Sequence, residues 1–326
     1  MDNLNLSSYL RNTCAIKKKF ESLTFKGTVK LHGCNTSIVL NKNNEIYYQS
    51  RNRVISPTCD HLNFCKLMEQ GKQQIYALFD KIKQTLKLKD AASTIVITGE
   101  YCGAHIQKGV GISLLPGQIF VIFSIKIDDN FYDIDMFNDV HDESAHIYNI
   151  SHFQKYAVTI NFSDSDDINK AVDLMTNYTI EVGKCCPVAY ALSKNTICGL
   201  GEGIVWTCVD DPSIELWFKT KIEDFAATTC QKTIPKDTET VKSINEFLLK
   251  VVTPNRLNQG FAYVIEMISP QSLSQKDIKT FLDWVWGDVV KEESDIIEKS
   301  GLSNLELKKE VNVKSKNWYM TMYNKV

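Results

Sequence analysis

The chain has 326 residues, of which 44% are hydrophobic and 23% are charged, and its formal net charge is −2. This length allows one large or two ordinary domains, and the composition is that of a globular protein. No apolar run of about 18 residues is present, so we expect neither a membrane span nor a membrane partner. The first twenty residues lack the order of a secretory signal. Because the ten cysteines form no CxxC, we expect reduced thiols in a cytoplasmic or nuclear protein.

Hydrophobic periodicity predicts mostly strands in the first two thirds of the chain. Strands are expected at 24–31, 36–40, 45–51, 93–101 and 118–127, with helices at 60–87 and 164–182. Segments 203–209 and 215–221 flank a DDPS turn, which favours a hairpin.

Helical patterns replace strand patterns after about residue 230. Phe247, Leu248 and Val251 fit one helix that stops near Pro254, and further helices are expected over 278–289 and 302–318. Strands followed by helices predict the α+β fold class with a helical C-terminal domain. The polar segment 228–240 places the boundary, so we predict domains at 1–235 and 236–326.

One lysine occupies a position suited to covalent chemistry. Lys30 follows a strand in TVKLHGCN (28–35), and a turn with Gly33 comes next. A deprotonated lysine amine can attack phosphorus. An ordinary lysine has a pKa near ~10.4, so nearby cations or desolvation must free its amine. On this segment alone, a solvated surface lysine is the commoner explanation.

Two glutamates and two lysines could bind the other parts of a nucleotide and its metal ion. Glu100 ends an apolar strand between glycines and could accept hydrogen bonds from a ribose. Glu202, also flanked by glycines, suits a Mg²⁺ ion that is held mainly by phosphates. Lys219 and Lys221 alternate on one strand, so their side chains share a face that could bind phosphate. Taken singly, each is equally explained as an exposed strand or turn residue.

The order of these segments resembles that of the covalent nucleotidyltransferases, and most closely the RNA ligase 2 family. That family includes a phage enzyme and the trypanosome RNA-editing ligases. Its pattern KxHGxN matches KLHGCN (30–35), with His32 where DNA ligases and capping enzymes usually have aspartate. SRNR (50–53), GEYCGAHIQKGV (99–110), FVIFSI (120–125), GEGIV (201–205) and KTK (219–221) resemble its further motifs. VTPNRLNQGF (252–261) and LKKEVNVKS (307–315) resemble its helical C-terminal segments.

The resemblance covers nearly the whole chain, with small departures. Cys34 replaces the usual threonine, and Ser124 stands where an aspartate is common. Neither change removes a reacting group.

The resemblance implies a nucleotidyltransferase (ATP-grasp-like ligase) domain of antiparallel sheets with flanking helices, and an ATP-dependent RNA ligase activity. The implied cofactors are ATP and Mg²⁺ or Mn²⁺, and the implied partner is RNA with 3′-OH and 5′-phosphate ends, nicked or structured. The implied catalytic residues are Lys30, His32, Glu202, Lys219 and Lys221. The implied nucleotide-binding residues are Val29, Lys30, Leu31, Asn35, Arg51, Glu100, Phe123, Glu202, Lys219 and Lys221. Glu202 is the implied metal ligand, and Arg53, Asn255 and Arg256 are the implied RNA contacts.

Two alternatives stay open at this point. One is a capping guanylyltransferase or a DNA ligase, which usually appends a β-barrel OB-fold, although the helical pattern after residue 240 opposes it. The other is a non-catalytic RNA-end-binding protein, although the intact lysines and glutamates oppose loss of activity. The sequence does not specify an oligomeric state.

Overall fold

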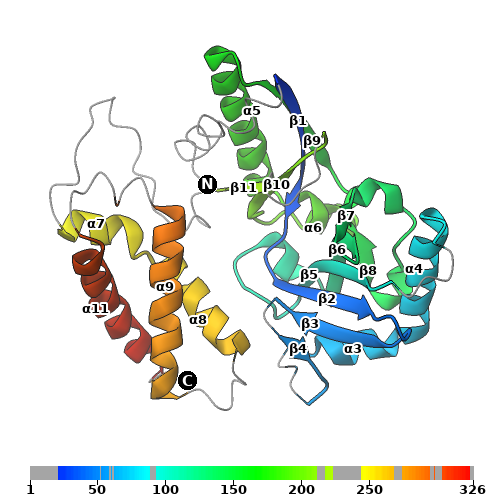
Figure 1. Ribbon diagram of the computed structural model, residues 1–326, viewed down its shortest axis with the longest axis horizontal. Coiled ribbons are helices and arrows are strands. Elements are labelled where there is room, and N and C mark those ends of the chain that lie inside the picture. The colour runs from blue at the N-terminus through cyan, green and yellow to red at the C-terminus, as the bar shows by residue number, and fades with distance from the viewer. Residues whose placement is uncertain are drawn as a thin grey trace. The chain divides into compact units, whose positions relative to one another are not determined.

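Figure 1 shows the helices and strands of the computed structural model. Alternating side chains of the first strand are buried, because one strand face packs on a core. This strand, β1 (Ser22–Lys30), belongs to a four-stranded antiparallel sheet of order β11-β10-β1-β9. The other strands are β9 (Lys155–Asn161), β10 (Gly203–Cys208) and β11 (Phe218–Lys221). Helix α5 (Ser165–Lys184) packs along this sheet and is capped by the Asp164 side chain.

A second sheet of seven strands has the order β4-β3-β2-β5-β6-β7, with β8 paired to β6. These strands are β2 (Cys34–Leu40), β3 (Ile46–Ser50), β4 (Val54–Ile55), β5 (Ile95–Gly103), β6 (Gln118–Ile127), β7 (Asn130–Tyr132) and β8 (Ile147–Asn149). All pairs are antiparallel except β6–β8. The predicted antiparallel sheets are therefore confirmed.

Helices and 3₁₀ turns flank the sheets. The helix predicted at 60–87 is divided at Gly71, whose N–H bonds to Met68 C=O, into α3 (Phe64–Gln70) and α4 (Lys72–Thr85). The shorter elements are α6 (Pro187–Leu192), η1 (Gly111–Leu114), η2 (Ile134–Phe137), η3 (Glu143–Ala145) and η4 (Ile150–His152).

The chain divides into two units, one ending at residue 222 and the other beginning at 223. The structure describes residues 21–51, 53–58, 60, 62–88, 93–210, 217–222, 244–267, 274–293, 297 and 303–323. The predicted boundary at 235 lies outside these residues and stays a prediction. Among the described helices, none combines the length and apolarity needed to cross a bilayer.

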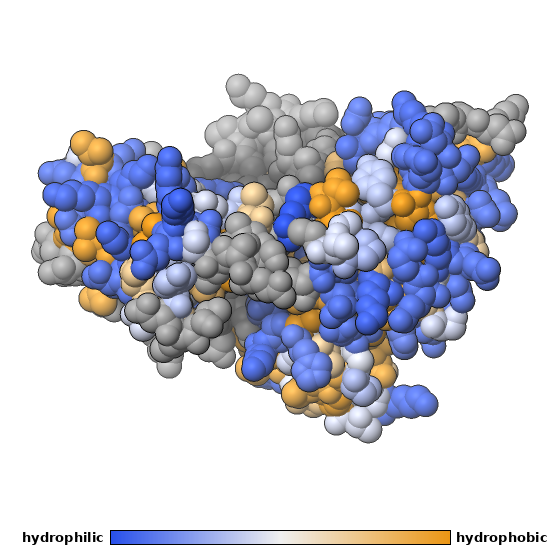
Figure 2. All heavy atoms as spheres, turned by 90° about the horizontal axis from the view of Figure 1, so that it is seen from below, coloured by the Kyte–Doolittle hydropathy of each residue, from blue (hydrophilic) through white to orange (hydrophobic). Residues whose placement is uncertain are grey.

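The C-terminal unit is helical as predicted. The elements among its described residues are α7 (Ile244–Val251), α8 (Pro254–Met267), η8 (Gln275–Asp277), α9 (Ile278–Glu292) and α11 (Asn304–Tyr323). Apolar side chains from the four α-helices form one core, including Phe247, Val264, Phe281 and Val311. The face of this unit that is seen at the left of Figure 2 is mainly hydrophilic, with scattered apolar residues. The exposed large apolar side chains of its described residues are Leu249, Met267, Val290, Leu305 and Val313. Its apolar side chains are thus largely buried in its own core.

Arg256 corrects one sequence prediction, because it lies in this core and not on an RNA-binding surface. The side chain is 0% exposed. Its Nε donates to Asp288 Oδ2 at 2.7 Å, Nη2 donates to Glu293 Oε1 at 2.8 Å, and Nη1 donates to Val251 C=O. A guanidinium enclosed in this way cannot reach a phosphate. The RNA contact predicted for Arg256 is therefore wrong, and the residue holds α8 against α9.

We expect Arg256→Ala to lower the free energy of unfolding of the helical unit by about 3–5 kcal/mol, because it removes one partner of a buried ion pair with Glu293, which is only 2% exposed. Denaturant unfolding of the full chain measures this. Lys309→Ala, at an exposed position of α11, is the control and should change stability by less than about 0.5 kcal/mol. Unchanged stability with weakened RNA binding would restore the original interpretation of Arg256.

One pair of cysteines differs from the expectation of reduced thiols. Cys185 and Cys198 form a disulfide, with Cα atoms 4.9 Å apart. The prediction of reduced thiols is wrong for these two residues, which thirteen positions of sequence separate. Cys65, Cys102 and Cys186 are free thiols, and all three are buried.

Candidate active site

Three neighbouring strands place residues that are far apart in the sequence side by side at one end of the four-stranded sheet. In the register of the four-stranded sheet, Lys30 at the end of β1 pairs with Gly203 at the start of β10. Gly203 in turn pairs with Lys221 at the end of β11. The residue before Gly203 is Glu202, so the antiparallel register sets a carboxylate between two lysines. This explains why KLHG, GEG and KTK lie together although about 190 residues separate the first from the last.

Glu202 is the centre of this cluster. Its side chain is 3% exposed, and its Oε2 accepts hydrogen bonds from Lys30 Nζ at 2.6 Å and from His32 Nδ1 at 3.1 Å. Lys221 Nζ lies 3.0 Å from the other oxygen, Oε1. Burial alone would raise the pKa of this carboxyl, but Lys30, His32 and Lys221 together hold the pKa of Glu202 well below its ordinary value. Glu202 is thus a permanent anion that positions the Lys30 amine.

The glycine after Glu202 is required by the backbone. Gly203 has φ +151°, a conformation that residues with a side chain rarely adopt. A Cβ at this position would lie 2.0 Å from Thr220 C=O on β11. Glu202 can therefore enter the sheet beside Lys221 only because glycine follows it.

The second sheet contributes Asn35 and Glu100, which pair directly across β2 and β5. Glu100 Oε1 accepts a hydrogen bond from Gly33 N–H at 3.0 Å, which ties the turn after Lys30 to β5. Burial raises the pKa of Glu100 to about 7, and the Glu202 charge adds to this, while Lys30, Gly33 N–H and Arg51 oppose it. The site therefore contains one permanently ionised carboxyl and one that titrates near neutrality.

We expect Glu100→Gln to stabilise the protein at alkaline pH. The pKa of Glu100 is raised from 4.5 to about 7 on folding, so the folded state disfavours its charged form. This penalty is absent below pH 4.5, grows as pH rises to about 7, and is complete above it, where it reaches about 3 kcal/mol. Thermal unfolding of both proteins from pH 4.5 to 8.5 measures it. A difference that does not vary with pH would refute this ionisation behaviour.

Phe123 and Arg51 lie at positions where their side chains could contact a bound nucleotide. Thr98 pairs with Ser124 and Gly99 with Ile122, so Phe123 is the extra residue of a β-bulge in β6. Bulges re-aim side chains, and Phe123 is half-buried rather than in the core. Arg51 is exposed, and its charge acts on Glu100. These contacts to nucleotide stay predictions.

The other predicted site residues are placed as follows. Val29 and Leu31 are buried, so only their backbone atoms are available to a ligand. Lys219 is half-buried on the same face of β11 as Lys221. Arg53 and Asn255 are half-buried, and their proposed contacts with RNA stay predictions.

The residues present fit a metal ion that arrives with a phosphate ligand. Among the described residues, no three His, Cys, Asp or Glu side chains converge as a metal cage. Both oxygens of Glu202 already face lysines or His32. Mg²⁺ commonly takes one or two carboxylates together with substrate phosphates and water. Glu202 can meet this requirement only if a lysine beside it turns to the phosphates.

Sequence reasoning missed two features of the site. It did not anticipate the ion pair of Lys30 with Glu202, because register between strands this far apart is not visible in a motif. It also missed the β-bulge at Phe123. The one signal for this bulge was that β6 has ten residues whereas its partner β5 has nine.

Lys30, the buried Glu202 and Lys221 of the four-stranded sheet thus lie near Glu100 of the other sheet, an arrangement that suits nucleotidyl transfer to a lysine. The model of the RNA ligase family matches residues 24–221, which are more than half of the chain. The chain therefore belongs to the RNA ligase family.

Solved structures were also compared. A mutant of the RNA ligase of Naegleria gruberi with ATP and Mn is 15% identical, with a TM-score of 0.42, and the match covers 65% of this chain and 53% of that one. The same ligase with PPi is 16% identical, with a TM-score of 0.40 and coverage of 67% and 52%. The chain thus spans about half the length of these ligases. No curated protein matches the chain.

Proposed function

We propose that this protein is an ATP-dependent RNA ligase that joins 3′-OH and 5′-phosphate RNA ends. The observation that supports this most is the contact of Lys30 Nζ with the buried Glu202, beside His32 and Lys221. Together with membership of the RNA ligase family, it favours a lysine nucleophile over a structural lysine. The proposed role is RNA repair or nick sealing, in the cytoplasm or nucleus.

The proposed reaction has three steps. The Lys30 amine attacks the α-phosphorus of ATP, a P–N bond forms, and pyrophosphate leaves. A 5′-phosphate oxygen of RNA then attacks this phosphorus, which releases Lys30 and gives an RNA-adenylate. Finally a 3′-hydroxyl attacks the activated 5′-phosphate and AMP leaves.

Each protein group has a proposed part in this sequence. Lys219 and Lys221 would stabilise charge that develops on the α-phosphate. Glu100 would bind the ribose, and Phe123 would stack on adenine. His32 and Asn35 would order the nucleophile and the transferred phosphate. Arg51 would bind phosphate as a planar donor.

Glu202 would hold Mg²⁺ or Mn²⁺ directly or through water. When bound, the ion offsets phosphate charge and so favours in-line attack. The Naegleria ligase structures with ATP and Mn are the reason to test both ions.

The helical unit is proposed to contact RNA through its surface and not through Arg256. Lys309 and Lys316 are exposed on α11 and could bind backbone phosphates without reading sequence. The described parts of this unit are helical, which opposes the OB-fold that a capping enzyme or DNA ligase would append.

Incubation with α-labelled ATP and Mg²⁺, followed by nicked RNA or DNA duplexes, tests the proposal. We expect covalent label from ATP and not from GTP, and sealing of RNA nicks. Labelling by GTP would indicate a capping enzyme, and sealing of DNA alone would indicate a DNA ligase. If no lysine adenylate forms, the non-catalytic RNA-end binder is the better explanation.

A further inference from the structure

The disulfide of Cys185 and Cys198 joins two segments next to the active site. Cys185 is the residue that follows α5, and Cys198 lies in the segment between α6 and β10. Cys185 is half-buried, whereas Cys198 is exposed. Cys198 is therefore the more exposed residue of the pair.

The free buried cysteines differ from this pair. Burial raises the pKa of Cys65 to about 12, and it also raises the pKa of Cys102 and of Cys186. Since the thiolate is the reactive form, these three residues are poor nucleophiles. Of these five cysteines, Cys185 and Cys198 are therefore the better placed for thiol exchange.

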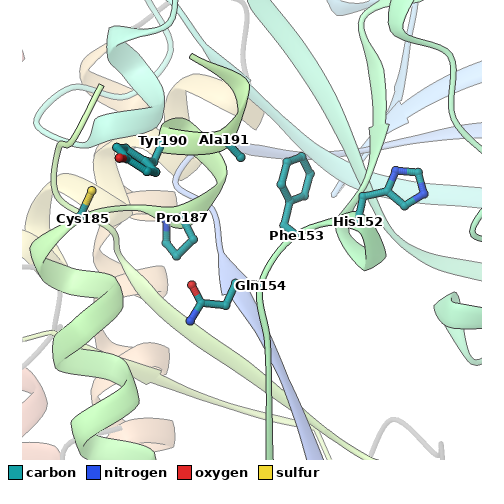
Figure 3. A pocket seen from close by; sticks show the side chains of 7 residues that line it. All are labelled: His152, Phe153, Gln154, Cys185, Pro187, Tyr190 and Ala191. Carbon is teal, nitrogen blue, oxygen red and sulfur yellow. The ribbon is translucent and has the colours of Figure 1, made fainter. Parts of the chain in front are cut away.

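A pocket of about 400 Å³ opens beside the disulfide (Figure 3). The pocket is lined by Cys185, Pro187, Tyr190 and Ala191 on one side and by His152, Phe153 and Gln154 on the other. This volume is within the range of small-ligand sites, roughly 300–1,000 Å³. The rings of Phe153 and Tyr190 beside the Gln154 amide suit a small peptide-like thiol, whereas the His152 imidazole points away from them and contacts Asn138 C=O.

The exposed cysteine is also connected to the site residues. Cys198 precedes Glu202 by four positions, and three backbone hydrogen bonds hold the chain between them. Cys186 N–H donates to Gly199 C=O at 2.8 Å, Gly201 N–H to Gly183 C=O at 3.3 Å, and Gly111 N–H to Leu200 C=O at 2.7 Å.

The backbone at Gly199 packs closely against Gly111. A Cβ on Gly199 would lie 2.6 Å from Gly111 Cα. The disulfide fixes one end of this segment at Cys198. The position of the segment therefore affects the position of Glu202.

We propose that Cys185 and Cys198 are a redox-responsive pair that exchanges with glutathione-class disulfides, and that the oxidised form favours lysine adenylation. The Cys198 thiolate attacks one sulfur of the oxidised tripeptide, and one tripeptide thiol leaves. The Cys185 thiolate then attacks the Cys198 sulfur, and the second tripeptide thiol leaves. Two thiols of the protein are oxidised, one disulfide is reduced, and two protons pass to the released thiolates. Only the adenylation part of this inference rests on the proposed function.

The test uses the full chain equilibrated in glutathione buffers of graded redox potential. Rapid alkylation and mass spectrometry follow the thiols, while thermal unfolding and labelling by ATP follow the consequences. We expect Cys185 and Cys198 to become protected together as the buffer becomes more oxidising. The oxidised protein should melt a few degrees higher and adenylate several-fold faster than the reduced one.

Variants separate the pair from other cysteines. Cys185→Ser, Cys198→Ser and the double variant should behave alike, equal to the reduced wild type, and should not respond to redox potential. Cys186→Ser, which changes the neighbouring buried cysteine, should keep the redox response.

Two results would overturn the inference: alkylation of the pair that does not vary with potential, or equal melting and adenylation in both redox states. A melting shift without ATP labelling in either state would refute the proposed activity but support the redox pair.

Discussion

Lys30→Ala should abolish covalent labelling by ATP, with a loss of at least about 10⁴-fold, because it removes the proposed nucleophile, and the neighbouring Lys221 amine lies on a different strand against the other oxygen of Glu202. Labelled ATP with gel separation of the protein measures this. The same variant should still seal RNA that already carries a 5′-adenylate, since the last step needs no lysine nucleophile.

Lys26→Ala is the matched control. Lys26 lies on the same strand and the same face as Lys30, but its amine pairs with Asp133 and Asp135. It should therefore keep ATP labelling. Retained self-labelling by Lys30→Ala would show that another residue is the nucleophile.

Glu202→Gln should lower the rate of lysine adenylation by at least about 10²-fold. The carboxylate contacts Lys30, His32 and Lys221 at once, and an amide of the same size cannot offset two ammonium charges. Glu202→Ala should fail as well, and added Mg²⁺ should not restore either variant fully. Single-turnover labelling over a range of Mg²⁺ concentrations measures both.

Glu69→Gln removes a carboxylate whose ion pair with Lys72 is exposed, so it should leave adenylation unchanged. Normal labelling by Glu202→Gln would show that the negative charge is dispensable. The proposed roles in positioning Lys30 and in holding the metal would then both be wrong.

The strands and helices were predictable because their signals are local. Alternation along β1, the apolar run of β6 and the helical spacing in α5 and α9 each reflect one element packing one face on a core. The order of these elements also predicted the α+β class and the helical C-terminal unit. The motif KxHGxN and the motifs that follow it predicted the family.

Only the tertiary structure decided which polar groups are buried and what they contact. Arg256 lies in a motif that also suits an RNA contact, and its burial follows from Asp288 and Glu293, more than thirty residues away. The Lys30–Glu202–Lys221 contact depends on the register of β1, β10 and β11. The Cys185–Cys198 bond depends on how the segment after α6 packs against the end of α5. By itself, the sequence determined the elements and the chemistry available to them, because both depend on neighbouring residues. Partners and pKa values required the fold, because burial and long-range pairing arise only when distant segments pack together.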